Sequence, residues 1–487
     1  MIRFVALLSV GLLFVVSTGI AGDTGSSAYA GQLLFTQIPI HEQGETPGSS
    51  SSRHSADLPD GSRIVLFDLA APGTGVTDLT PGFAAAGRPD LSFDGTRVLF
   101  VARRGSNEPL NVWEVGLDGA SPRQITDRTE DAAQAIYLSA LFTLNATMPE
   151  QRIAYCTDDG VKRGPGVACA ALYTCRLDGS QTRQITFNPY GVGDPHLLSD
   201  GRLLYVSARP PDSGGGTALF TVHPDGTDVS PFVAVHDPAA NRGMPAETAD
   251  GSVVFVESDL AAPADGGALI AVSRSRSLHG RRTIGGSDAG SYRSPRGLSD
   301  GRLLVSYRSG RDQTYGIQLL DPRGAHPPVD LFDAEDRHDV DALEVRPRRP
   351  PAGRSSVVGE DSEHGYLYCM DAYLSDRDAA RKIAKGSIAG LRVFEATPAG
   401  PARLLAEVPV RDDGSFYLQL PARTALRLET IDAAGELLQS MENWIWVMPD
   451  EQRGCIGCHE DRERTPPNRH PQALRAQPQI IGRDSKP

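Results

Sequence analysis

The sequence contains few cysteines and few aromatic residues, and beyond its N-terminus it has no long hydrophobic run. Of its 487 residues, 6 are cysteine and 6% are aromatic. No stretch after residue 16 is long and apolar enough to cross a bilayer. The sequence also lacks G-x-S-x-G, P-loop and H-E-x-x-H motifs, which excludes the enzyme classes that they mark. A net charge of −13 argues against nucleic acid or an anionic membrane as a partner.

The N-terminus has the pattern of a secretory signal. Arg3 precedes an uncharged apolar run of 13 residues, from Phe4 to Val16, which is short for a membrane span. Small residues allow cleavage after Ala21 or after Ala30, so we predict a signal peptide within residues 1–30. The alternative is an uncleaved anchor. Either arrangement places the protein in the periplasm or elsewhere outside the cytoplasm, and cleavage leaves no stable membrane span.

Glycine and proline are abundant, and turn signals recur about every 50 residues. The chain has 51 Gly and 36 Pro, which suits many short strands joined by turns. Asp-Gly pairs precede apolar strands at residues 94, 200, 250 and 300. About four strands per repeat is typical of a β-propeller blade. We therefore predict an all-β fold with a propeller of about six blades over residues 31–350, the alternative being a β-sandwich or β-solenoid.

The ring is expected to close through strands from both ends of the repeat region. We assign the inner strands of this split blade to residues 31–40 and 62–69, and its remaining strand to residues 340–350. Residues 351–365 form a polar linker. After it, the predicted strands no longer follow the 50-residue repeat, and they predict a small β-sandwich over residues 366–450. Residues 451–487 form the final segment and tail.

The most specific motif is Cys455-Ile456-Gly457-Cys458-His459. In a C-x-x-C-H sequence the two thiols can attach one haem covalently, and the adjacent imidazole can bind its iron. The sequence therefore predicts one covalent haem c, with Cys455 and Cys458 as attachments and His459 as an axial ligand. No second C-x-x-C pair is present to complete a four-cysteine zinc site.

A sixth iron ligand would decide the role of this haem. His or Met there favours electron transfer, whereas an open position permits small-molecule binding or redox catalysis. The candidates are Met441, Met448, His364 and His470. Trp444 and Trp446 share one face of a predicted strand, where they wall the haem or fill the core. Other histidines, such as His196 in Asp194-Pro195-His196, are expected in turns.

The other four cysteines are Cys156, Cys169, Cys175 and Cys369. In an oxidising compartment they can pair in three ways. Cys156 ends one predicted strand and Cys169 precedes the next, so a disulfide at the base of this hairpin is geometrically sensible. Buried free thiols, or a zinc or haem-proximal role for one of them, are the alternatives.

Two resemblances to known families extend these predictions. Residues 89–95 (PDLSFDG) and 123–126 (RQIT) resemble the repeats of TolB-type, PD40 and WD40-like propellers, whose blade residues are structural. The order of propeller, small β domain and the segment WIWVMPDEQRGCIGCHED resembles the hydrazine synthase alpha-subunit middle-domain family. This resemblance implies a propeller packed on a haem-bearing domain, and it implies sister subunits.

The sequence departs from that family at two points. Only 28 residues (487 − 459) follow His459 without a second C-x-x-C-H, so we expect the second-haem domain of the family to be absent. The resemblance implies a zinc ion at His459 and a tyrosine near the iron four residues later, where this chain has Glu463. Glu463 is therefore a candidate for contact with the iron or a metal, and the hydrazine chemistry is not carried over.

Two functions of different classes remain open. The first is an exported c-type haem redox protein that acts in electron transfer or as an oxidoreductase subunit, with a periplasmic redox partner or sister subunits. The second is a propeller-based protein-binding module in which the C-x-x-C-H is a structural zinc site. A binding scaffold without metal comes third. The sequence does not decide whether the protein is an enzyme.

Overall fold

The computed structural model describes residues 31–40, 58–143, 147–157, 170–210, 214–233, 240–260, 266–278, 280–285, 290–375, 382–397, 401–457, 465 and 468–482. Regular structure in these residues is β-strand apart from two short 3-10 helices, η1 (Pro72–Thr74) and η5 (Gln472–Arg475). The predicted signal peptide lies outside the described residues, as do Cys169, Cys458, His459 and Glu463. No helix in the described part of the chain is long and apolar enough to span a bilayer.

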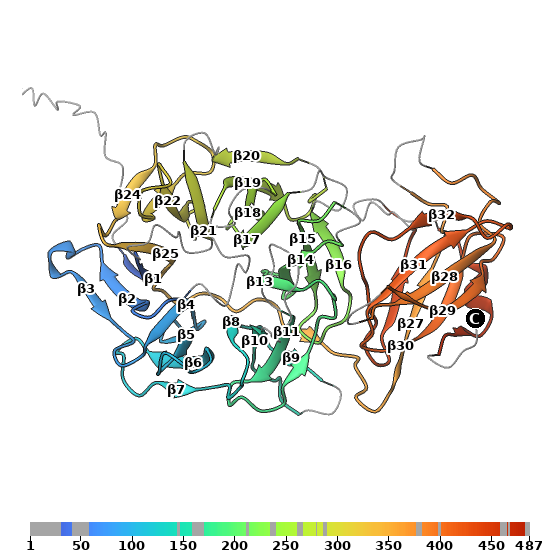
Figure 1. Ribbon diagram of the computed structural model, residues 1–487, viewed down its shortest axis with the longest axis horizontal. Helices are drawn as coiled ribbons and strands as arrows, with labels where there is room; N and C mark the ends of the chain where they lie inside the picture. Colours follow the sequence, from blue (N-terminus) through green and yellow to red (C-terminus); the bar gives the residue numbers. More distant parts are fainter. Residues whose placement is uncertain are drawn as a thin grey trace, which may run out of the picture.

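Six antiparallel sheets of four strands surround a central axis, which confirms the predicted six-bladed propeller (Figure 1). From the innermost strand outward, the first blade contains β25 (Arg337–Glu344), β1 (Gln32–Pro39), β2 (Arg63–Asp68) and β3 (Val76–Asp78). The second contains β4 (Ala85–Leu91), β5 (Arg97–Arg103), β6 (Asn111–Gly116) and β7 (Arg123–Gln124). The third contains β8 (Ala132–Tyr137), β10 (Arg152–Thr157), β11 (Ala171–Arg176) and β12 (Arg183–Gln184).

The remaining three blades follow in sequence order. The fourth contains β13 (Val192–Leu197), β14 (Leu203–Ala208), β15 (Thr217–Val222) and β16 (Ser230–Val233). The fifth contains β17 (Asn241–Glu247), β18 (Ser252–Ser258), β19 (Ala268–Ser273) and β20 (Arg282–Gly285). The sixth contains β21 (Ser291–Gly297), β22 (Leu303–Arg308), β23 (Gly316–Leu320) and β24 (Val329–Phe332). The Asp-Gly pairs form the predicted turns, as at Gly201, whose φ of 83° suits glycine.

The split blade closes with a different strand order from the one we predicted. β25 begins at Arg337 and is the innermost strand of its blade, so the assignment of the inner positions to residues 31–40 and 62–69 was wrong. β1 lies between β25 and β2 and is antiparallel to both. The Gln37 Nε2 atom donates to Asp339 Oδ1 at 2.9 Å across this closure. The first and last strands of the ring are therefore hydrogen-bonded directly.

Five of the six innermost strands contain the same irregularity. A non-glycine residue with positive φ interrupts the pairing in each, namely Arg88, Asp194, Met244, Ser294 and Asp341. Proline follows the first four of them. Proline has no N–H to donate to the neighbouring strand. At a bulge the extra residue is unpaired, so no such hydrogen bond is required there, and the side chain of the bulged residue points in a new direction. These residues line the central channel at one level.

The second domain is a sandwich of two four-stranded sheets. One sheet has the order β33-β27-β30-β34, with β27 at His364–Cys369, β30 at Phe416–Pro421, β33 at Gln452–Cys455 and β34 at Gln479–Ile480. The other has the order β29-β28-β31-β32, with β28 at Gly390–Glu395, β29 at Arg403–Pro409, β31 at Leu426–Ile431 and β32 at Leu437–Ser440. Buried residues alternate with half-buried ones along β27 and β30, so one face of each strand packs in the core.

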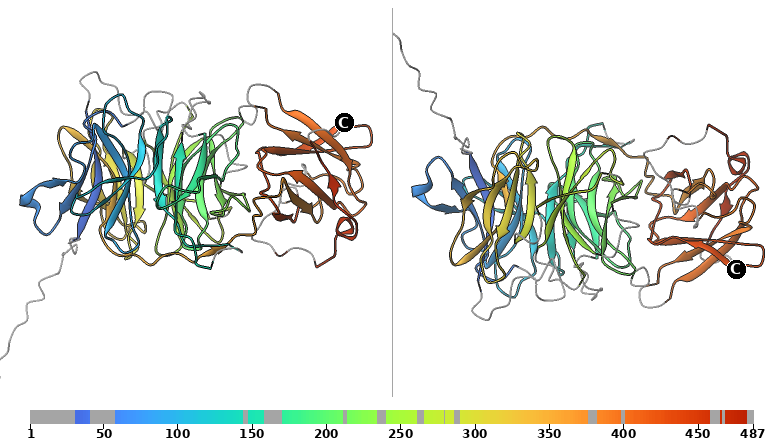
Figure 2. Two further views of the ribbon diagram at one scale, coloured as in Figure 1. Left: turned by 90° about the horizontal axis from the view of Figure 1, so that it is seen from below. Right: turned by 90° about the horizontal axis from the view of Figure 1, so that it is seen from above.

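The sandwich packs against the side of the propeller at the third and fourth blades (Figure 2). Trp446 is 1% exposed, and its Nε1 donates to Gly226 O at 2.9 Å. Glu451 accepts the Asp228 N–H at 2.8 Å. The two domains share one hydrophobic cluster. A further link pairs β26 (Arg354–Ser355) in parallel with β9 (Leu141–Phe142) of the third blade. Trp446 therefore joins the domains.

Candidate functional site

Cys455, the first cysteine of the C-x-x-C-H motif, is the last residue of the edge strand β33. This strand runs parallel to β27, and its register pairs Cys455 with Cys369. The strand is held from within by Arg453, which is 6% exposed and donates from Nη1 to Trp446 O at 3.1 Å. The half-buried Cys455 packs against the shared hydrophobic cluster. The motif therefore begins at a fixed point on the sandwich.

The segment between Cys455 and Arg469, which we call the motif segment, is bound at both ends to the same residue. The Met370 N–H donates to Cys455 O at 2.9 Å. The Arg469 Nη2 atom donates to Met370 O at 3.0 Å and forms an ion pair with Asp371 at 2.7 Å. The two ends of the motif segment consequently meet beside the loop that follows β27.

Residues 470–482 pack on the sandwich, which therefore extends beyond the predicted boundary at residue 450. The Ala473 N–H in η5 donates to Ser415 Oγ at 2.9 Å, and β34 pairs in parallel with β30. Ile481 is fully buried. This packing keeps the C-terminal end of the motif segment in place.

Two glycines allow close approach at the start of the motif segment. A Cβ atom at Gly457 would lie 2.3 Å from Leu374 O, and one at Gly454 would lie 2.5 Å from the Tyr368 ring. Neither distance is compatible with a side chain unless neighbouring atoms move. The backbone at Gly457 therefore passes close to Leu374 in the loop after β27.

Three tyrosines gather on the outward face of the sheet that contains β33. Tyr417 lies with its ring centroid 6.1 Å from that of Tyr366 and 6.4 Å from that of Tyr368. The Tyr417 hydroxyl donates to Gln452 Oε1 at 3.2 Å. Partial burial, followed by the neighbouring Tyr366, raises the pKa of Tyr417. These side chains give the sheet an aromatic outer surface next to the strand that leads into the motif.

The predicted sixth ligands are dispersed. Met448 is 3% exposed and packs at the domain interface beside Gly226. Met441 packs against the shared cluster, and His470 is exposed with its Nδ1 3.1 Å from Pro471 O. His364 begins β27, five residues before Cys369, which separates their Cα atoms by roughly 17 Å in a strand. Their approach to the iron stays a prediction, because His459 lies outside the described residues.

The cysteines are also arranged differently from our prediction. Cys156 is fully buried and its thiol is free, so it does not form the predicted hairpin disulfide. In the sheet it stands opposite Leu172. Cys169 lies outside the described residues. Burial raises the pKa of Cys175 to about 12, which makes this thiol unreactive. Cys369 lies in the sandwich, paired in register with Cys455. It is thus separate from Cys156 and Cys175, which lie in the third blade.

Met370, Arg469 and Tyr368 are the neighbours of the motif that sequence reasoning missed. The contact between Arg469 and Met370 joins residues 99 positions apart, so no local sequence pattern predicts it. No group of three or more His, Cys, Asp or Glu side chains suited to a metal occurs in the part of the chain that is described. The described geometry therefore fixes the position of Cys455 and the two ends of the motif segment.

Comparison with known proteins agrees with this architecture. Residues 366–460 match the family model of the hydrazine synthase alpha subunit middle domain. The hydrazine synthase subunit alpha of Kuenenia stuttgartiensis is 24% identical over 557 aligned positions, which cover 91% of this chain and 68% of that protein.

The solved structure of Kuenenia stuttgartiensis hydrazine synthase supports the same fold. The chain superposes on Kuenenia stuttgartiensis hydrazine synthase with a TM-score of 0.78 at 21% identity, covering 92% of this chain and 71% of that one. A putative TolB from Agrobacterium tumefaciens matches with a TM-score of 0.31 at 14% identity, covering 67% and 94% of the two chains. The protein is therefore similar to the hydrazine synthase alpha subunit over most of its length, and its residues 366–460 match the middle-domain model of that family.

Proposed function

We propose that this protein is an exported c-type haem protein that serves in redox chemistry, as an electron-transfer protein or as an oxidoreductase subunit. One observation carries the proposal. The C-x-x-C-H motif begins at the end of β33, and both described ends of the motif segment are bound to Met370. An anchored segment of this kind suits a large cofactor that is attached through two nearby side chains.

The residues present fit covalent haem attachment. Cys455 and Cys458 would form the two thioethers, and His459 would bind the iron, with Glu463 as a further candidate near the metal. The half-buried Cys455 packs against apolar side chains, and its backbone is fixed at the end of β33. Gly457 allows the chain to pass close to Leu374 between the two cysteines. A bound haem c would supply one-electron redox chemistry at this position.

Location and partners complete the proposal. The sequence pattern of residues 1–30 supports export to the periplasm, where two thiols and a haem can be joined. The relative from Kuenenia stuttgartiensis is named as a subunit, which supports an assembly with sister subunits for this chain as well. A periplasmic redox partner would exchange electrons with the haem.

The test is a visible spectrum and a pyridine haemochrome assay on the full chain, made in the periplasm with cytochrome c maturation factors. We expect a Soret band and a haemochrome of the two-thioether type that stays with the protein after denaturation. A ferrous form that shifts on adding carbon monoxide would assign an open iron site, and an unresponsive one would assign electron transfer.

The same preparation tests the alternative of a structural zinc site. Zinc at about one equivalent per chain, without a Soret band, would overturn the haem proposal and support the protein-binding module. Release of all haem on denaturation would also overturn it, since thioether bonds survive unfolding.

A further inference from the structure

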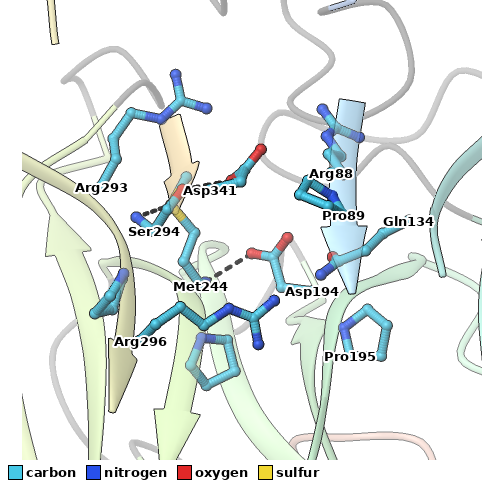
Figure 3. Close-up of a pocket in the computed structure, with 12 residues that line it drawn as sticks. Arg88, Pro89, Gln134, Asp194, Pro195, Met244, Arg293, Ser294, Arg296 and Asp341 are labelled. Atoms are coloured by element: carbon cyan, nitrogen blue, oxygen red, sulfur yellow. Dashed lines mark hydrogen bonds between the residues drawn. The ribbon is translucent and has the colours of Figure 1, made fainter. Parts of the chain in front are cut away.

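A small cavity lies in the central channel of the propeller, at the level of the five bulges (Figure 3). It has a volume of about 60 Å³. A water molecule needs roughly 10–15 Å³, so the space admits a small polyatomic ion and excludes a nucleotide or a peptide. All five bulge residues with positive φ line it. Such backbone conformations gather at functional sites.

Two of the charged residues in the cavity are carboxylates, and both already accept hydrogen bonds from neighbouring blades. Asp194 Oδ2 accepts the Met244 N–H at 2.8 Å. Asp341 Oδ1 accepts the Ser294 hydroxyl at 2.6 Å, and its Oδ2 lies 3.5 Å from Thr36 Oγ1. These bonds connect successive innermost strands around the ring. The acidic side chains therefore have a structural role at the closure of the propeller.

Three arginines line the same cavity, and their hydrogen-bonding capacity is largely unused. Arg88 donates from Nη1 to Ala133 O at 2.5 Å. Arg293 has a buried Nε without a partner in the described structure, and its guanidinium carbon lies 5.6 Å from the Tyr315 ring centroid. The Arg296 backbone pairs with Leu304 of β22, but its guanidinium has no hydrogen bond or ion pair to a described residue. Figure 3 shows its guanidinium directed toward the middle of the cavity, near Asp194 and Gln134.

The charges in the cavity sum to one positive unit, since three guanidinium groups face two carboxylates. Nearby His196 adds no charge, because burial and then Arg296 and Arg348 lower its pKa to about 3. Its Nε2 accepts the Glu247 N–H at 2.9 Å. A positive excess in a confined, partly buried space favours an anion, and guanidinium donors match the two oxygens of a carboxylate or a related oxyanion.

We propose that the channel cavity binds a small monovalent anion with two oxygens, of the size of a short carboxylate, held by Arg293 and Arg296. This site is in the propeller and does not depend on the haem proposal. The anion would occupy the donors that the protein leaves unpaired and would neutralise the excess charge. The five bulges would position its ligands from different blades.

The test uses [13C]acetate as the probe and the line width of its carbonyl signal as the readout, with the full chain. We expect line broadening that formate reverses by competition. The substitutions Arg293→Gln and Arg296→Gln should each weaken binding by roughly ten-fold, and the double variant should abolish it, because each removes a charge-assisted contact. Thermal melts check that the variants are folded. Arg296→Lys replaces Arg296→Gln if that variant does not fold.

The matched control is Arg302→Gln in the same blade, where Arg302 pairs with Asp300 on the rim at 2.7 Å. It should leave the broadening unchanged. Broadening by the folded double variant equal to that of the unmodified protein would overturn the proposal, as would equal loss in the control. Absence of broadening with the unmodified protein would also overturn it.

Discussion

The channel of the propeller and the surroundings of the motif segment are built in opposite ways. In the channel, one device recurs in five innermost strands, and the bulges at Asp194, Met244 and Ser294 are spaced 50 residues apart. Around the motif segment, each contact occurs once, as with Met370 and Arg469. Because the bulge is repeated in five strands, the channel geometry does not depend on any one of them. The geometry around the motif depends on single residues. Single substitutions should therefore have their largest effects near the motif.

The largest expected effect follows from removing both motif cysteines. Cys455→Ala with Cys458→Ala should abolish covalent haem, because no thioether can form, and the Soret band of the denatured protein measures this loss. Cys369→Ala is the matched control, since it removes the thiol paired in register with Cys455 and leaves the motif intact. Retention of covalent haem by the double variant would contradict the assignment of the attachment site.

The next effect tests whether one backbone contact directs the motif segment. Gly457→Ala should lower haem incorporation several-fold, since its new Cβ would lie 2.3 Å from Leu374 O. Ile456→Ala, at the adjacent position, should retain the haem content of the unmodified protein. The ratio of haem absorbance to protein measures both variants. Equal incorporation by the two would show that the close approach at Gly457 is unimportant.

The domain interface allows a comparison of two tryptophans in the segment between β32 and β33, where the strand that we predicted does not form. Trp446→Ala should lower the free energy of unfolding by about 3–5 kcal/mol because it empties a buried site that joins the domains. Trp446→Phe should cost about 1–2 kcal/mol, since it leaves Gly226 O without its donor. Urea unfolding measures both.

Trp444→Phe is the control for that measurement. The buried Trp444 Nε1 has no hydrogen-bond partner in the described structure, so removing it should change stability little. A cost for Trp444→Phe as large as that for Trp446→Phe would contradict the role of the Gly226 hydrogen bond.

The last prediction concerns pH and the closure of the ring. Burial raises the pKa of Asp339 to about 7, whereas an unfolded aspartate titrates near 4. Between about pH 4 and pH 7 the folded protein retains a proton that the unfolded chain loses, so stability falls as pH rises and levels off above pH 7. Asp339→Asn should flatten this dependence of the urea midpoint. An unchanged slope would contradict the assignment.

The repeat made the propeller predictable, but not its channel. Asp-Gly turns at regular spacing indicated the blades, and six four-stranded sheets are present. The segment containing Asp194, Pro195 and His196 was placed in a turn because proline usually interrupts a strand. It lies inside β13, where the bulge removes the need for a proline N–H. Proline in a repeated innermost strand therefore indicates a bulge.

The candidate site was predictable only as far as the motif itself. The spacing of Cys455, Cys458 and His459 is a local signal that carries its own chemistry. The contacts of Met370 with Cys455 and Arg469 join segments that are distant in sequence, and they depend on the parallel pairing of β27 with β33. Parallel pairing of these strands follows from the completed sandwich, so residue patterns alone did not reveal it.

The position of β25 has a consequence for how the chain folds as it is made. β1 is among the first strands to be synthesised, yet its partner Asp339 lies 302 residues beyond Gln37. The other five blades are complete in sequence before the ring can close, because their strands are consecutive or nearly so. Contacts this distant are slow to form. The first strand must therefore remain with one edge unpaired until nearly the whole propeller has been synthesised.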